Sequence, residues 1–188
     1  MRLDRSFVRY WSDRYVDGEL TPLERELLAT THLAIAECGY LTADDLEKIG
    51  TWKAQRVLGY LSKNAENTIV DVTRLALAPK TPEWMRHHIL RILEGVGHPM
   101  ASAILTVWDP TNHTILDYRA VDALQELKKR GAFDLEPPSG RRGALPGYWT
   151  YLQAYQPIAK SVGVSFRDLD RALWKWHKEE MPEKWPGK

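Results

Sequence analysis

The sequence predicts an all-α fold, and three observations support this prediction. Apolar residues recur at intervals of three and four along most of the chain, which is the period of a helix. Strand-like alternation of apolar and polar residues is hard to find. Thr, Ser and Asp stand before the periodic stretches, whereas Pro and Gly mark their limits. With 188 residues, 44% of them hydrophobic, the chain can bury one core or two lobes around a cleft.

The first periodic stretch, "LTPLERELLATTHLAIAE", predicts a helix with Thr21 as N-cap, Pro22 in its first turn and Glu24 completing a capping box. Thr42 is expected to cap the next helix and Gly50 to end it. Further helices are predicted over residues 51–64 and 67–78.

Two later helices stand very close together in the sequence. Residues 81–93 predict a helix capped by Thr81, and residues 99–108 predict one that begins at Pro99. Only residues 94–98 join them, and two of these are glycines, so we expect a tight turn between the helices. The remaining predicted helices cover residues 117–129, 148–161 and 166–180, the last of them capped by Ser165, and a long Gly- and Pro-rich loop covers residues 130–147.

Charge and cysteine content limit the classes of function. The formal net charge is +1, so binding to nucleic acid requires a local patch. The single cysteine, Cys38, cannot form an intramolecular disulfide, an iron–sulfur cluster or a thiolate zinc site. No stretch has the character of a signal peptide or the length of a membrane span. These features predict a soluble, cytoplasmic protein.

The turn in "LEGVGHPMASAIL" has a chemistry of its own. At the start of the second helix, backbone amides and the positive end of the helix dipole can hold a phosphate oxygen. Glycines lack the Cβ atom that would keep a nucleic-acid strand away. Such a contact reads the backbone and not the base sequence.

This stretch resembles the signature L-P-G-V-G-x-K-T-A of the helix-hairpin-helix DNA glycosylase superfamily. The position of the family's lysine falls on Pro99, and that of its aspartate falls on Asp117, which lies 117 − 99 = 18 residues further on, as is usual in the family. The resemblance covers residues 81–124. It implies a unit of residues 1–188 with a cleft between two helical lobes, one of residues 41–108 and one of residues 1–40 and 117–188.

The resemblance implies a catalytic role for Asp117, which stabilises the oxocarbenium-like transition state at the sugar and orients water. Because Pro99 cannot act as an amine nucleophile, base removal without strand cleavage is expected. The implied partner is double-stranded DNA with a damaged, mismatched or modified base, bound by a monomer. The implied contacts to the DNA backbone are Gly95, Val96, Gly97, His98, Met100 and Ala101. No cofactor is expected beyond a monovalent cation, which the family holds at positions matching the carbonyls of Arg91, Leu93 and Val96.

Other interpretations stay open at this stage. Asp117 can be a helix N-cap, and the glycine turn can simply join two packed helices. The protein can then be a DNA-binding module without catalysis. A third interpretation is a metal hydrolase built on the histidines, which are His87, His88, His98 and His113. Candidates for the base pocket or for strand contact are Trp52, Lys53, Arg56, Tyr118 and Arg119.

Overall fold

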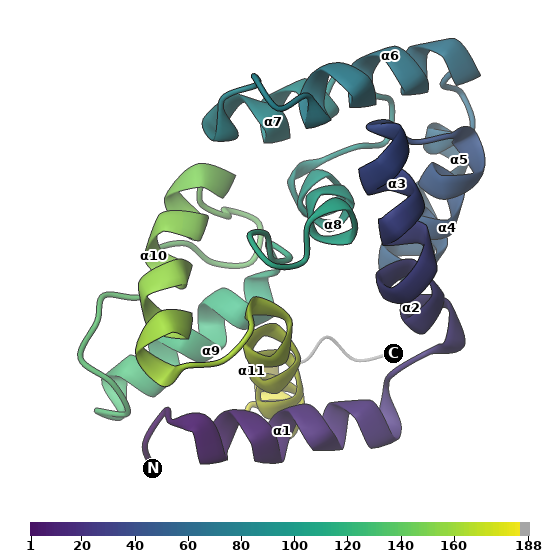
Figure 1. Ribbon diagram of the computed structural model, residues 1–188. Coiled ribbons are helices and arrows are strands. Elements are labelled where there is room, and N and C mark those ends of the chain that lie inside the picture. Colours follow the sequence, from purple (N-terminus) through teal and green to yellow (C-terminus); the bar gives the residue numbers. More distant parts are fainter. Residues whose placement is uncertain (185–188) are drawn as a thin grey trace. The chain divides into compact units, whose positions relative to one another are not determined.

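The computed structural model describes residues 1–184, and these form an all-α fold, as predicted (Figure 1). Its α-helices are α1 (Arg5–Gly18), α2 (Pro22–Glu26), α3 (His32–Cys38), α4 (Ala43–Ala54), α5 (Leu58–Leu61), α6 (Glu66–Leu77), α7 (Glu83–Leu90), α8 (His98–Trp108), α9 (Tyr118–Lys129), α10 (Tyr148–Val162) and α11 (Phe166–Glu180). A π-helical segment, Leu27–Thr31, joins α2 to α3, and a 3₁₀ turn, Gln55–Val57, joins α4 to α5. Across residues 1–184 no helix is both long and apolar enough to span a membrane.

Contacts between Cα atoms divide the chain into two compact units. One consists of Met1–Leu20 together with residues 116–184, and the other of Thr21–Ile115. The boundaries differ from the expected ones at residues 21–40, because the helical segment over Thr21–Cys38 packs against α4 and α8. The predicted helix pair and Asp117 therefore belong to different units.

The first unit is built around α11. Helix α1 packs along α11, and α11 also packs against α9 (Figure 1). The side chains of Trp176, Tyr151 and Tyr155 are fully buried here. Trp174, in the same helix as Trp176, is only half-buried. Since large aromatic side chains bury the most surface, this row of rings supplies much of the unit's stability.

The second unit is built around α8. Every side chain from Met100 to Val107 is buried, and the helix contacts α3, α4 and α7. A helix that is buried on all sides must be apolar all round, which explains why "MASAILTV" has so little polar character. Its two hydroxyl groups bond within the helix, as Thr106 does to the carbonyl of Ser102 at 2.8 Å.

Helix ends that depend on local bonds agree with the prediction. Thr21 accepts from the amide of Glu24, Thr42 and Asp45 form a capping box, and Ser165 accepts from the amide of Asp168. The buried carboxyl of Glu24 also accepts from Nε1 of Trp52 at 3.3 Å.

Two predicted helix ends are wrong. Gly50 does not end its helix, since α4 continues to Ala54. A Cβ atom on Gly50 would lie 2.5 Å from Cδ1 of Leu61, so this glycine makes room for α5. Thr81 does not cap α7, because its hydroxyl donates to the carbonyl of Leu75 at 2.6 Å. Pro82 is the N-cap of α7 and makes no side-chain capping bond.

Candidate functional site

The turn between α7 and α8 is longer than predicted. Helix α7 ends at Leu90, and α8 begins at His98, one residue before Pro99. The amide of Leu93 donates to the carbonyl of Leu90 at 3.2 Å, and the amide of Val96 donates to the carbonyl of Leu93 at 3.1 Å. Residues 91–97 thus form two consecutive hydrogen-bonded turns in place of one short link. The resemblance assigned three carbonyls to a cation, and one of them, that of Leu93, accepts the hydrogen bond from the Val96 amide in this turn.

Gly95 and Gly97 have different structural roles. Gly95 has φ +78°, and a Cβ atom there would lie 2.9 Å from Cβ of Tyr60 and 3.1 Å from the amide nitrogen of Leu61. Both the backbone conformation and the close approach of α5 therefore require glycine at position 95. Packing against α5 is therefore a sufficient explanation for glycine at position 95, without a contact to DNA.

Neither the backbone conformation nor packing within the chain requires glycine at position 97. Its φ is −83° and its ψ −176°, which is extended backbone that any residue adopts. A Cβ atom on Gly97 would meet nothing within 4 Å, and the residue is exposed. The absence of a side chain leaves open surface in front of the α8 N-terminus.

Three amides at this N-terminus have no hydrogen-bond partner within residues 1–184, namely those of Gly97, His98 and Met100. Gly97 is the N-cap of α8 but carries no side chain that could bond to them. The amide of Ala101 donates to the Gly97 carbonyl at 2.9 Å, and that of Val96 is used in the turn. Of the residues expected to contact DNA, Val96 and Ala101 therefore have their amides occupied within the chain.

Asn64 holds the turn in place from outside. Its Oδ1 accepts from the amide of Glu94 at 2.8 Å, and its Nδ2 donates to the carbonyl of Glu94 at 3.0 Å. Nδ2 also donates to the carbonyl of Leu61 at 2.8 Å, which anchors the side chain to the end of α5. The expectation that Asn64 ends a helix missed this second role, because its partner lies 30 residues away.

His87 fixes the start of α8 from the other side. The ring is 2% exposed, and its Nε2 lies 3.1 Å from the carbonyl of His98. Because a carbonyl only accepts, Nε2 is the protonated nitrogen in this bond. Burial lowers the pKa of His87 to about 4, so the ring is neutral at pH 7. Burial also lowers the pKa of His98, and the positive charge of Arg91 adds to this effect.

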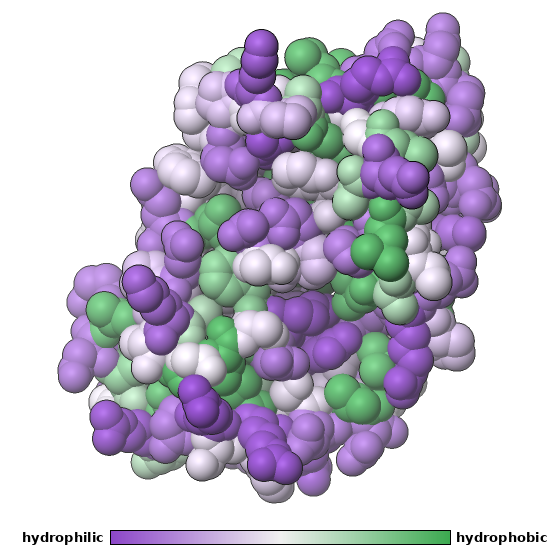
Figure 2. Space-filling model, in the orientation of Figure 1, coloured by the Kyte–Doolittle hydropathy of each residue, from purple (hydrophilic) through white to green (hydrophobic). Residues whose placement is uncertain are grey.

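Exposed aromatic and cationic side chains surround the turn. Tyr60, which contacts Gly95, is 54% exposed, and Nζ of Lys63 lies 4.9 Å from the centre of its ring. Arg91 is exposed and makes no ion pair within residues 1–184. On the face of the molecule drawn in Figure 2, hydrophobic side chains form separate groups among hydrophilic ones. Tyr60 and Lys63 were missed from the sequence, where only their spacing of three in "YLSK" suggests a shared surface.

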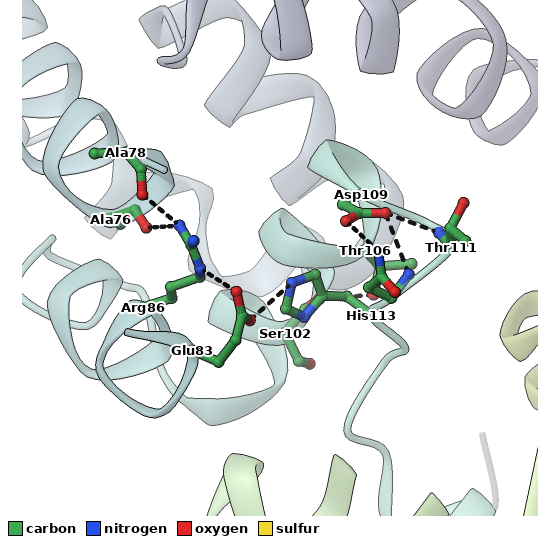
Figure 3. A network of polar contacts seen from close by, with 10 residues as sticks. Ala76, Ala78, Glu83, Arg86, Ser102, Thr106, Asp109, Thr111 and His113 are labelled. Carbon is green, nitrogen blue, oxygen red and sulfur yellow. Dashed lines mark hydrogen bonds and ion pairs between the residues drawn. The ribbon is translucent and has the colours of Figure 1, made fainter. Parts of the chain in front are cut away.

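His113 belongs to a different network from the other histidines of this unit (Figure 3). Arg86 donates to the carbonyls of Ala76 and Ala78 at 2.7 and 3.0 Å and to Oε1 of Glu83 at 2.7 Å. Oε2 of Glu83 lies 3.5 Å from Nε2 of His113. This network joins α6 to α7 and to the loop after α8. Among residues 1–184, no three or more His, Cys, Asp or Glu side chains gather as a metal-binding group would.

The side chains predicted for the base pocket lie in both units. Trp52 and Lys53 are half-buried in α4, and Trp52 is engaged with Glu24. Arg56 is exposed in the 3₁₀ turn that follows α4. Tyr118 and Arg119 lie beside Asp117 in the other unit. The five candidates are thus divided between the two units.

Asp117 is the N-cap of α9, as the structural interpretation predicts. Its Oδ1 accepts from the amide of Arg119 at 3.0 Å, and its Oδ2 lies 3.5 Å from Nη1 of Arg119. The side chain is 12% exposed. The helix N-terminus and the guanidinium both stabilise negative charge on this carboxylate.

Buried polar rings surround Asp117. Burial raises the pKa of Tyr151 well above its usual value, and the charge of Asp117 contributes to this shift. Burial lowers the pKa of His177, whose Nε2 lies 3.7 Å from Oδ2 of Asp122, while Asp117 opposes the shift. The hydroxyl of Tyr118 is buried and has no hydrogen-bond partner among the described residues. Asp117 is therefore a charged group in a mostly buried, polar setting.

Basic residues cluster at positions 128–130 and 141–142 of this unit, and several of them contact neighbouring groups. Lys128 donates to the carbonyl of Asp134, and Nε of Arg130 lies 2.9 Å from Oε1 of Glu126. The guanidinium of Arg142 lies 5.5 Å from the centre of the Tyr118 ring.

No family model, curated protein or solved structure matches this chain, so its function is inferred from its own residues.

Proposed function

We propose that this chain is a monofunctional DNA N-glycosylase that binds the DNA backbone with a helix-hairpin-helix motif. The observation that carries the proposal is the N-terminus of α8, where three unpaired amides lie behind the open surface left by Gly97. A helix N-terminus with unpaired amides favours an anion, and a phosphate of the DNA backbone is such an anion.

The surroundings of the turn support a contact with DNA. Asn64 and His87 hold the backbone of the turn from two sides, so a phosphate would meet preorganised donors. Arg91 and Lys63 supply positive charge, and the exposed ring of Tyr60 offers an apolar surface. Glu94 opposes the binding of an anion, because its exposed side chain adds a negative charge to the turn.

Asp117 is the proposed catalytic residue. In the reaction, the bond between the base and C1′ of deoxyribose breaks, and the electron pair leaves with the base. A water molecule adds to C1′, and its proton passes to the solvent or to the carboxylate. The ionised carboxylate of Asp117 stabilises the positive charge that develops on the sugar. Pro99 stands at the lysine position and cannot form a Schiff base, which is why we propose hydrolysis alone.

Asp117→Asn tests this function, because asparagine is as good an N-cap as aspartate and leaves α9 intact. Purified protein is incubated with duplexes carrying uracil, thymine mispairs, alkylated purines, oxidised bases or modified cytosines, and alkali then reveals abasic sites. Turnover should fall by about 10²–10³-fold or more in the variant, since a preorganised electrostatic contact is lost. Affinity for the duplex should stay within about twofold.

Asp134→Asn is the matched control, because it removes one carboxylate from an exposed loop of the same unit. It should leave turnover unchanged. Abasic sites in none of the duplexes would rule out glycosylase activity on these bases.

The second candidate is a DNA-binding module without catalysis. It is favoured by the capping bond of Asp117, which is by itself a sufficient reason for an aspartate at this position. A module of this kind binds duplex DNA equally well with asparagine at position 117 and releases no base with either residue.

A further inference from the structure

A groove of about 440 Å³ opens on the unit Thr21–Ile115, between α4, α5 and the start of α6. This volume lies within the range of small-molecule sites. None of the residues that line it is among the candidate site residues predicted from the sequence, and the groove lies outside the α8 amides that are proposed to bind DNA.

The floor of the groove is apolar. Leu46, Leu61 and Ile69 line it, and they are 1%, 3% and 1% exposed. The half-buried side chain of Leu58 extends this surface toward the solvent. A ligand that fits this floor needs a compact apolar body, whose burial supplies most of the affinity.

Gly59 keeps the mouth of the groove open. It lies in α5, a single short turn of four residues. A Cβ atom at this position would meet nothing within 4 Å, so no contact inside the chain requires glycine. A larger side chain here would instead occupy the groove.

The rim of the groove is acidic. Glu47 lines it, is exposed and makes no ion pair within residues 1–184. Oε2 of Glu66 accepts from the amide of Ala43, another lining residue, at 3.0 Å, and Glu66 has no cationic partner in the described chain. Asp44 is different, because Nζ of Lys48 lies 3.0 Å from its Oδ2. Two carboxylates are thus left to attract a cation.

We propose that this groove binds a small organic cation with a compact apolar body, and that its occupation stiffens the turn between α7 and α8. The link is Asn64, which lines the groove and makes two bonds to the backbone of Glu94. A ligand packed against Leu61 and Asn64 restricts the side chain that holds the turn. This proposal does not depend on a glycosylase activity.

The test is a titration of the ¹⁵N-labelled full chain, followed by NMR, with three probes of similar size. Phenethylammonium is the cation, 2-phenylethanol is its neutral analogue, and phenylacetate is the anion. The cation should give saturable shifts of the amides of Gly59 and Leu61, with about two- to fivefold tighter binding than the alcohol, as expected for an exposed ion pair. Hydrogen exchange of the Glu94 amide should slow when the cation is bound.

Variants separate the groove from non-specific binding. Gly59→Leu should abolish the shifts, whereas Gly59→Ala should retain them, and both residues favour the helix over glycine. Glu47→Gln should lower the affinity for the cation toward that for the alcohol, with Glu66 retaining part of the preference, while Glu37→Gln, at an exposed position of α3, should leave the affinity unchanged.

Equal binding of cation and anion, or unchanged binding by Gly59→Leu, would overturn the site. Binding without slower exchange at Glu94 would overturn the link to the turn. If Gly59→Leu does not fold, the comparison of Glu47→Gln with Glu37→Gln tests the site, and equal cation affinities of these two variants would overturn it.

Discussion

The two glycines of the α7–α8 turn should respond to alanine in opposite ways. At Gly95, an L-residue with φ near +78° costs about 1–2 kcal/mol. The Cβ atom, 2.9 Å from Cβ of Tyr60, adds about 1–3 kcal/mol of overpacking. Gly95→Ala should therefore lower the free energy of unfolding by about 2–5 kcal/mol.

At Gly97 neither cost applies, because φ is −83° and the space around the Cβ position is open. Gly97→Ala should change the free energy of unfolding by less than about 1 kcal/mol, because the lower entropy of the unfolded chain offsets the loss of a favourable N-cap residue. The methyl group would instead stand in front of the α8 amides. Loss of one charge-assisted bond to a phosphate, about 1.5–3 kcal/mol, corresponds to a roughly 10- to 100-fold weaker affinity for DNA.

Urea unfolding followed by circular dichroism measures the free energy of unfolding. Fluorescence anisotropy of a labelled duplex at fixed salt concentration measures the affinity for DNA. Gly147→Ala is the control, since Gly147 is also an N-cap with negative φ and no atom closer than 3.9 Å to its Cβ position. If Gly97→Ala binds duplex DNA as tightly as the wild type and the control, the α8 N-terminus is not the DNA contact.

Three further predictions concern charge and burial. Glu94→Gln should strengthen binding of duplex DNA about two- to fivefold in the same anisotropy assay, because only the backbone of Glu94 is bonded to Asn64. Arg86→Met should lower the free energy of unfolding in urea by about 2–3 kcal/mol, less than for a fully buried pair because Glu83 is 44% exposed. The folded-state pKa of His87 is about 4, below the unfolded value of 6.5, so its contribution of about 3 kcal/mol is present above pH 6.5 and is lost as the pH falls toward 4. His87→Gln should flatten this part of the plot of unfolding free energy against pH, and an unchanged slope would contradict the assignment.

The features predicted correctly from the sequence are those that depend on neighbours in the chain. Thr42, Ser165 and Asp117 cap helices through amides two or three residues away, so their residue type and position predict the bond. The α-helical class is predicted for the same reason, because periodicity is a local property.

Where a prediction is wrong or incomplete, the deciding partner is often distant in the sequence, although Thr81 donates to Leu75 only six residues away. Gly50 was expected to end a helix, but the side chain of Leu61 decides its role. Glu24 was assigned only to a capping box, and the bond that its carboxyl group accepts from Trp52, 28 residues away, was missed. The support that Asn64 gives to the turn was missed for the same reason. A single sequence carries no signal for such pairs.

Asp117 shows how a structural role limits a chemical one. The amide of Arg119 and the start of α9 stabilise the ionised carboxylate, and the guanidinium of Arg119 adds to this stabilisation. Protonation of the carboxylate would forfeit these contacts. Within the proposed function, Asp117 is therefore better suited to stabilise positive charge on the sugar than to take a proton from water. The same contacts that justify an aspartate as N-cap thus favour electrostatic stabilisation over general-base catalysis.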